Sequence, residues 1–235
     1  MSDKESTFSW IKSNLITIFY AIIIALLIRT FLFQPFFIPS SSMEPGLLVG
    51  DRIFASKYNY GYSRHSFPFS MPIINGRIFE SSPKRGDVVI FKPSHTRNDY
   101  IKRLIGLPGD KIKLLDGTVY INSNPVEREF VRTDDKDIAI YRETMASGVS
   151  YETRDLGDKP QDNMEEFVVP ENYYFFMGDN RDNSNDSRFW GPVPAERIVA
   201  KAQIIFFSTK DGSWFIQFWR WPFDIQFERL FKFIK

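Results

Sequence analysis

The feature that most constrains this chain is an apolar run near its N-terminus, from Leu15 to Phe33. Its only charged residue is Arg29. A helix rises about 1.5 Å per residue, so this run reaches about 28 Å, close to the roughly 30 Å hydrocarbon core of a bilayer. We therefore predict a transmembrane helix that Pro35 ends, with Arg29 near enough to its end to reach the lipid headgroups.

A cleaved secretory signal is the alternative for this run. The apolar part of such a signal usually has about 7 to 15 residues, and a small-x-small cleavage site follows it directly. This run is longer, and no such site follows at once. The flanking charges weakly favour an N-terminus inside the cell, because Lys4 and Lys12 precede the run whereas the first cation after it is Arg52.

The composition excludes several kinds of site. Lysine and arginine total 30 against 29 acidic residues, so there is no basic excess and we expect no nucleic acid as a partner. Cysteine is absent, which removes disulfides and thiol nucleophiles. The two histidines, His65 and His95, are too few for a multi-histidine zinc site, and we expect no metal and no cofactor.

The rest of the chain predicts antiparallel β structure, because short apolar segments follow one another without a long amphipathic helix between them. The clearest signal is a hairpin of Lys111–Leu115 and Thr118–Ile121 around Asp116-Gly117. The other predicted strands are Asp87–Phe91, Tyr100–Ile105, Phe167–Val169, Tyr173–Met177 and Ile204–Phe207.

These segments predict a division of the chain into an N-terminus inside the cell, an anchor, a main β domain in two parts, a smaller polar insertion and an aromatic tail. The corresponding ranges are 1–14, 15–33, 34–121 with 167–210, 122–166 and 211–235. In the tail, apolar residues recur at helical spacing from Asp224 onward, which predicts a helix. That helix would lie on a membrane surface or pack on the protein's own core.

Residues 38–45, Ile-Pro-Ser-Ser-Ser-Met-Glu-Pro, form the first cluster that could carry chemistry. Prolines on both sides favour an extended backbone. In an extended chain Ser40 and Ser42 point to one face, so a nucleophile and an oxyanion donor could lie side by side. The alternative is a polar linker between anchor and domain.

The second cluster surrounds Lys102. Alternation along the predicted strand places Tyr100, Lys102 and Leu104 on one face. Desolvation by apolar neighbours lowers the pKa of an amine and can make it a general base. An exposed strand lysine is the alternative.

The third cluster is the polar segment 178–188. In an extended chain Ser184, Asp186 and Arg188 share one face, so an ion pair between Asp186 and Arg188 could lie beside the Ser184 hydroxyl. A calcium loop would require an acid at every second residue from Asp179, and Arg181 interrupts that spacing.

Taken together, residues 38–45, 84–89, 100–110 and 178–188 follow one another behind a single apolar helix. In this order they resemble the motifs of the bacterial type I signal peptidases, the S26 family of Ser-Lys proteases, and the resemblance covers about residues 10–207. It implies a mainly antiparallel β catalytic domain behind one transmembrane anchor. It also implies a serine endopeptidase that cleaves signal peptides from exported pre-proteins, with small residues at P1 and P3.

The resemblance implies a role for each residue of the site. Ser42 would be the nucleophile and Lys102 the general base, and Ser40 would add a hydroxyl to an oxyanion hole formed with the backbone N–H of Ser42. Ser184 would hydrogen-bond to Lys102 and orient it, with Asp186 and Arg188 in support. The residues implied to bind substrate are Phe36, Ile38, Pro39, Met43, Leu47, Tyr100 and Ile101.

The partners implied are pre-protein signal peptides and the lipid bilayer, with the catalytic domain on the extracytoplasmic face of the bacterial cytoplasmic membrane and the N-terminus inside. Gly46 departs from the family pattern, which usually has threonine at this position. The absence of that threonine could loosen the turn beyond Ser42. A membrane-tethered peptide-binding module is the alternative from another class, and turnover separates the two. An organellar relative would need a transit peptide, and the few residues before the helix carry acidic side chains.

Overall fold

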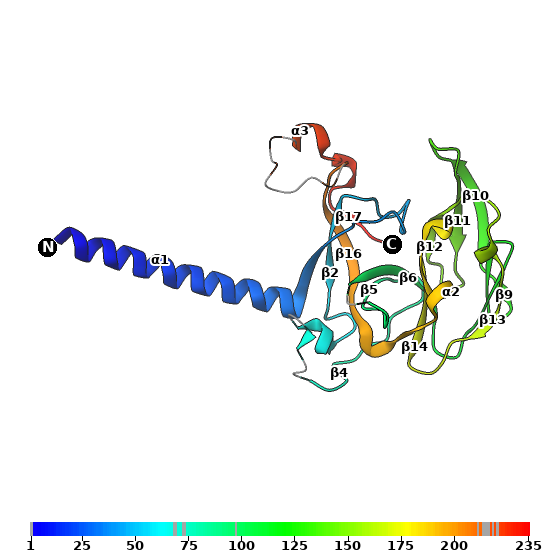
Figure 1. Cartoon of the computed structure of the whole chain (residues 1–235), viewed down its shortest axis with the longest axis horizontal. Coiled ribbons are helices and arrows are strands. Elements are labelled where there is room, and N and C mark those ends of the chain that lie inside the picture. Colours follow the sequence, from blue (N-terminus) through cyan, green and yellow to red (C-terminus); the bar gives the residue numbers. More distant parts are fainter. Residues whose placement is uncertain are drawn as a thin grey trace.

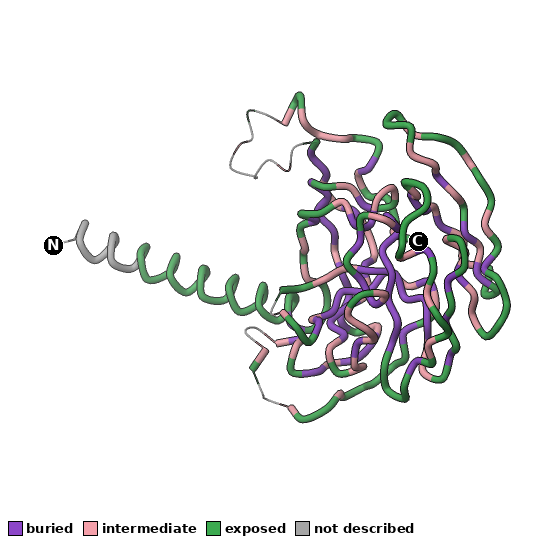
Figure 2. The backbone as a smooth tube through the Cα atoms, turned by 45° about the vertical axis from the view of Figure 1, so that its right-hand side comes forward, coloured by how far each residue is buried: buried purple, intermediate pink, exposed green. Residues whose placement is uncertain are grey.

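The computed structural model describes residues 2–67, 70–71, 74–96, 98–210, 212, 217, 219 and 221–235. A long helix, α1 (Ser2–Leu27), projects from a β domain and continues into one π-helical turn, η1 (Ile28–Leu32) (Figure 1). Residues Trp10–Leu32 are apolar and long enough to cross a membrane, and nearly all of them are exposed (Figure 2). A helix of membrane length is thus confirmed. It begins before Leu15 because lysine and glutamate in the preceding residues are good helix formers.

The main sheet has eight strands in the order β1-β2-β16-β5-β6-β14-β15, with β17 also paired to β16. Every pairing between its strands is antiparallel, which confirms the predicted fold class. Its strands are β1 (Phe33–Phe37), β2 (Asp51–Ser56), β5 (Val88–Phe91), β6 (Tyr100–Gly106), β14 (Tyr173–Met177), β15 (Val193–Pro194), β16 (Ile198–Ser208) and β17 (Lys232–Phe233). The central strand β5 is buried on both faces, as its uninterrupted run of apolar residues requires.

Two smaller sheets lie at the end of the molecule opposite α1 (Figure 1). One contains β7 (Lys111–Leu115), β8 (Thr118–Ile121), β9 (Asn124–Pro125) and β13 (Met164–Val168). The other contains β10 (Glu127–Thr133), β11 (Ala139–Thr144) and β12 (Ser150–Asp155). The predicted β7–β8 hairpin is confirmed, and Asp116 and Gly117 both have the positive φ that its two-residue turn needs. Because β7 pairs with both β8 and β13, this sheet starts at Lys111, earlier than the predicted insertion.

The remaining elements are short. They are the strand pair β3 (Tyr62–Ser63) and β4 (Arg77–Ile78), the helices α2 (Ser187–Trp190) and α3 (Trp221–Asp224), and the 3-10 turns η2 (Arg64–Ser66), η4 (Pro160–Asp162), η5 (Arg181–Asn183), η6 (Ala195–Arg197) and η8 (Phe227–Arg229).

The predicted tail helix from Asp224 onward is wrong. α3 ends at Asp224, η8 is a single turn, and Phe231 has a φ of 59°, which no helix tolerates. The chain then adds β17 to β16 and buries part of Ile234 against the core. An isolated helix this short is only marginally stable. Pairing with β16 instead gives the backbone N–H and C=O groups of β17 hydrogen-bond partners.

Candidate active site

The segment between β1 and β2 holds Ser40 and Ser42 in a closed loop. The Ile38 N–H donates to the Asp51 carbonyl (2.9 Å), and the Gly50 N–H donates to the Ile38 carbonyl (3.1 Å). Ile38, Met43 and Leu47 are buried in one apolar cluster with the main sheet. These contacts fix both ends and the middle of the loop, so that Ser42, itself buried, has a defined position.

Lys102 reaches Ser42 from the middle of β6. The Lys102 Nζ donates a short hydrogen bond to the Ser42 Oγ. Lys102 is 4% exposed and pairs with Val89 of β5, so its amine emerges from the interior of the sheet. The structure therefore brings together the two residues predicted to be nucleophile and base, from positions 60 residues apart.

Burial lowers the pKa of Lys102 from the usual range of a lysine to about 8, because little water can solvate the ammonium form. The charges of Asp186 and Asp179 oppose this change, and the charge of Arg188 favours it. A pKa of about 8 leaves roughly one amine in ten neutral at pH 7, far more than for a free lysine.

Ser40 lies on the same side of the loop as Ser42. Their Oγ atoms are 3.3 Å apart, and Ser40 is exposed whereas Ser42 is buried. The hydroxyl of Ser40 thus lies at the solvent side of the Ser42 Oγ, where it can donate to the oxygen of a carbonyl group that this Oγ attacks.

The segment after β14 packs directly on the loop that carries Ser42. The Asn180 N–H donates to the Ser42 carbonyl (3.1 Å), and the Asn180 Nδ2 donates to the Ser41 carbonyl (3.0 Å). A side chain on Gly178 would meet the Ser184 Oγ at 2.2 Å and the Ser42 carbonyl oxygen at 2.5 Å. Our sequence reasoning gave Gly178 and Asn180 no role, because these contacts are made across the fold and not along the chain.

Two expectations for this segment need correction. Ser184 is buried near Ser42, but its Oγ makes no hydrogen bond, so the predicted bond to Lys102 is not formed. The alternating extended face is also wrong: Asp186 is the N-cap of α2, and Arg188 lies in that helix. The predicted ion pair is nevertheless present, with Arg188 Nε 2.9 Å from Asp186 Oδ1, because an N-cap aspartate can accept from both the helix backbone and a side chain two residues later.

A cleft of about 650 Å³ opens beside Ser42 and Lys102. Five of the predicted substrate-binding residues line it: Phe36, Ile38, Pro39, Tyr100 and Ile101. Met43 and Leu47 do not. They are fully buried and line a separate cavity of about 520 Å³ behind the loop, because these two side chains pack into the apolar cluster of the main sheet.

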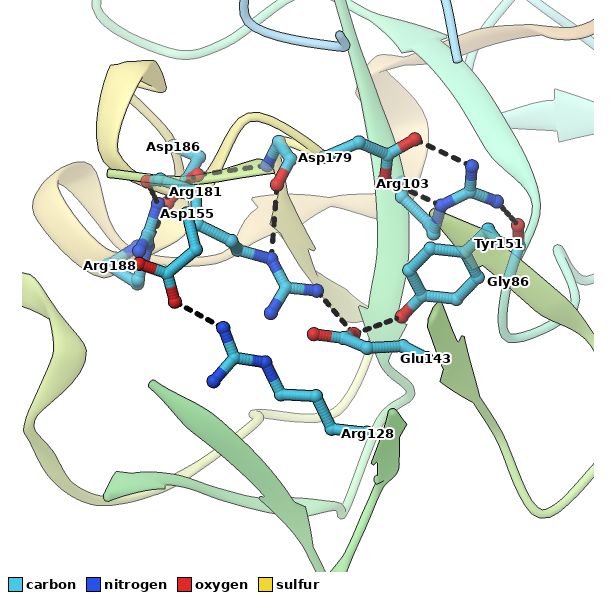
Figure 3. Close-up of polar contacts among 11 residues, drawn as sticks. Gly86, Arg103, Arg128, Glu143, Tyr151, Asp155, Asp179, Arg181, Asp186 and Arg188 are labelled. Atoms are coloured by element: carbon cyan, nitrogen blue, oxygen red, sulfur yellow. Dashed lines mark hydrogen bonds and ion pairs between the residues drawn. The ribbon is translucent and has the colours of Figure 1, made fainter. Parts of the chain in front are cut away.

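Buried ion pairs support the segment after β14 from below (Figure 3). The Arg103 guanidinium donates to both oxygens of Asp179, at 2.7 Å each. Arg181 pairs with Glu143 of β11 (2.5 Å), and the hydroxyl of Tyr151 of β12 donates to the same carboxylate (2.8 Å). The region predicted as a polar insertion thus contributes directly to the support of the site, a role that no local motif signals.

The described residues contain no group of three or more His, Cys, Asp or Glu that could hold a metal ion. The Ser42 Oγ itself contacts the Ser40 hydroxyl and the Lys102 amine.

Comparison with known proteins identifies similar sequences. The model of the family "Signal peptidase, peptidase S26" matches residues 8–207. A signal peptidase I of Rickettsia bellii is 41% identical, with 90% of this chain and 81% of that protein aligned. A signal peptidase I of Rickettsia typhi is 39% identical, with 98% of this chain and 96% of that protein aligned. A solved structure of a signal peptidase I from Enterococcus faecalis is 26% identical and covers 52% of this chain and 97% of its own, with a TM-score of 0.37, so the sequence relatives carry the comparison.

Proposed function

Since the chain belongs to the S26 signal peptidase family and is a peptidase, we propose that it cleaves pre-protein signal peptides with a Ser42–Lys102 dyad. The observation that carries this proposal is the hydrogen bond from the buried Lys102 amine to the Ser42 hydroxyl. A serine hydroxyl is a weak nucleophile and needs a base within hydrogen-bond reach. Lysine serves as that base when its pKa is depressed, as burial depresses it here.

The first step is acylation. Neutral Lys102 takes the proton of the Ser42 hydroxyl while the Ser42 Oγ attacks the scissile carbonyl carbon. The oxyanion accepts hydrogen bonds from the Ser42 backbone N–H and the Ser40 hydroxyl, which lies 3.3 Å from the attacking oxygen. The Lys102 ammonium then gives its proton to the leaving amine, and the mature protein departs with a new N-terminus.

The second step is hydrolysis of the ester on Ser42. Lys102, neutral again, takes a proton from a water molecule that attacks the ester carbonyl. The second tetrahedral intermediate collapses, Ser42 regains its proton from Lys102, and the signal peptide leaves with a carboxylate end.

For specificity, we propose that small residues occupy P1 and P3. The cleft that Ser42 borders has walls formed by the apolar residues Ile38 and Ile101 and by Tyr100. Alanine, glycine or serine at P1 should be cleaved and phenylalanine rejected by steric exclusion. Efficient cleavage after phenylalanine or arginine would refute this assignment of the pocket.

For location, we propose that the catalytic domain lies on the extracytoplasmic face of the membrane with the N-terminus inside. The lysines before the apolar helix support this orientation. We also propose that the tail touches lipid: Phe223, Phe227 and Phe231 are 81%, 67% and 70% exposed, and α3 lies on the side of the domain that faces α1 (Figure 1).

The experiment that tests the dyad is cleavage of a pre-protein by the detergent-solubilised full chain. Ser42→Ala and Lys102→Ala should each reduce kcat by about 10³-fold or more while the thermal unfolding midpoint persists. The exposed residues Ser81 and Lys113 offer matched controls, and Ser81→Ala and Lys113→Ala should cleave at the original rate. Normal turnover by Lys102→Ala would overturn the mechanism.

A further inference from the structure

A second, basic cavity lies where the anchor meets the β domain. Its volume is about 150 Å³, and its wall includes Arg29 and Thr30 of η1 together with Lys57, Lys92 and Asp99 from the β domain. The catalytic mechanism uses none of these residues. Asp99 also borders the catalytic cleft, so the two cavities share this residue.

The charges around this cavity do not balance. Three of its lining residues are cations, and Asp99 is the only acidic one among the described residues that line it. Asp99 is already paired with Lys92, whose Nζ lies 2.7 Å from the Asp99 Oδ1. Arg29 and Lys57 therefore add positive charge that no second carboxylate among the described residues of the cavity wall offsets.

The unbalanced positive charge affects Lys57 most. It is 2% exposed, and its Nζ donates to a neutral acceptor, the Ser66 carbonyl (2.5 Å). Burial and the charge of Arg29 lower the pKa of Lys57 to about 8; Asp99 opposes this change, whereas Lys92 adds to it. Burial of a charge without a charged partner is unfavourable, and an anion between Lys57 and Arg29 would remove the imbalance.

The position of the cavity indicates the source of the anion. Arg29 and Thr30 lie in the last turns of the membrane-length segment Trp10–Leu32, so the cavity opens at the depth where lipid headgroups begin. A phosphate diester carries a full negative charge and accepts hydrogen bonds from guanidinium and ammonium groups. Basic side chains at this depth attract anionic lipids.

We propose that this cavity binds the phosphate of an anionic phospholipid headgroup between Arg29 and Lys57, with Lys92 at its rim. The bound lipid would hold the β domain against the membrane at the base of its anchor. The site is separate from the dyad, and its test is a binding measurement that does not depend on peptidase activity.

The test titrates the full chain in a neutral detergent with short-chain phosphatidylglycerol, phosphatidylcholine or inorganic phosphate and follows the thermal unfolding midpoint. Phosphatidylglycerol should raise the midpoint and phosphatidylcholine should not, because a ligand of the folded state stabilises it. Arg29→Gln combined with Lys92→Gln should weaken phosphatidylglycerol binding by roughly tenfold. The control, Lys113→Gln combined with Lys136→Gln, removes one exposed lysine of β7 and one of the turn between β10 and β11, and should leave binding unchanged.

A variant that is expected to tighten binding distinguishes the proposal from a simple folding defect. Asp99→Asn removes the only acid of the cavity wall in the described part of the chain and frees Lys92, so it should tighten phosphatidylglycerol binding several-fold. The proposal is overturned if phosphatidylcholine stabilises equally, if the double variant retains the phosphatidylglycerol response, or if Asp99→Asn weakens it. An equal response to inorganic phosphate would refute the lipid as the ligand.

Discussion

At the scale of single residues, the proposed mechanism depends on one lysine. Lys102 lies in the interior of the main sheet, where burial lowers its pKa to about 8. Asp186 is the carboxylate that most opposes this change, and it is already paired with Arg188. The neutralised carboxylate matters because an unpaired Asp186 would hold Lys102 in its charged form.

The pKa of Lys102 predicts the pH dependence of cleavage. Only the neutral amine accepts the Ser42 proton, so kcat/KM should rise with pH and level off above about pH 8. The check is a pH profile of kcat/KM for the wild type beside His65→Ala and His95→Ala, which should keep the same acidic limb. If either histidine variant lost that limb, the base would not be a lysine.

Arg188→Gln should shift the acidic limb upward. Without the Arg188 charge, the carboxylate of Asp186 raises the pKa of Lys102, so less of the amine is neutral at pH 7. The measurement is again the midpoint of the kcat/KM profile. A purely structural role for Arg188 would reduce activity at every pH and leave the midpoint in place.

At the scale of elements, two segments position the loop that carries Ser42. The segment after β14 holds the loop through Asn180, and the C-terminal segment holds it through Arg229 of η8. The Arg229 guanidinium donates to both Asp51 oxygens (2.9 and 2.5 Å) and to the Gly46 carbonyl (3.0 Å). The Asp51 carboxylate also accepts the Leu48 N–H (2.8 Å), so this one ion pair fixes three points of the loop.

Arg229→Gln should therefore lower kcat with little change in KM, because it loosens the position of Ser42 without altering the cleft walls. A loss of about tenfold is expected, together with a fall of a few degrees in Tm from the Asp51 charge left buried without its partner. Lys232→Gln serves as the control, because it removes an exposed cation of β17 from the same C-terminal segment. Equal losses in the two variants would argue against this role for Arg229.

Gly178→Ala tests the contact between the two loops. The added methyl would lie 2.5 Å from the Ser42 carbonyl oxygen, so one backbone segment has to move. We expect the folded state to be destabilised by about 1–3 kcal/mol. We also expect kcat to fall by a larger factor than KM changes. Gly46→Ala is the matched control, because its methyl would meet neighbours only at 3.4 Å or more. The comparison is made by thermal unfolding and steady-state cleavage. Full activity of Gly178→Ala would show that the contact is dispensable.

At the scale of the whole molecule, the anchor and the cleft are close along the chain. η1 passes directly into β1, and Ser42 follows Phe33 by nine residues, a span of at most about 30 Å. A substrate held by its own apolar segment presents its cleavage site at a similar height, and confinement to the membrane raises its effective concentration.

The proposed orientation predicts which part of the chain an external protease can reach. Protease added to intact spheroplasts should digest the chain after about Pro35, because the β domain would be accessible from outside. A fragment that ends near the anchor should survive and be seen with a label at the N-terminus. Full protection of the β domain would place it on the cytoplasmic side.

The local patterns of the sequence determined the membrane-length helix and the β7–β8 hairpin, because helical length and turn chemistry depend on neighbouring residues. Ser42 and Lys102 were selected by the resemblance of four motifs to a known family, since each motif alone left a structural alternative open. Only the tertiary structure decided which segments that are far apart in sequence contact one another. It turned the predicted tail helix into a strand paired with β16, pointed Met43 away from the cleft, and placed Glu143 of the polar region beneath the segment after β14. The physical reason is that the free energy of these contacts comes from pairing and burial between distant segments. The hydrophobic periodicity of one segment therefore does not specify which other segment it packs against.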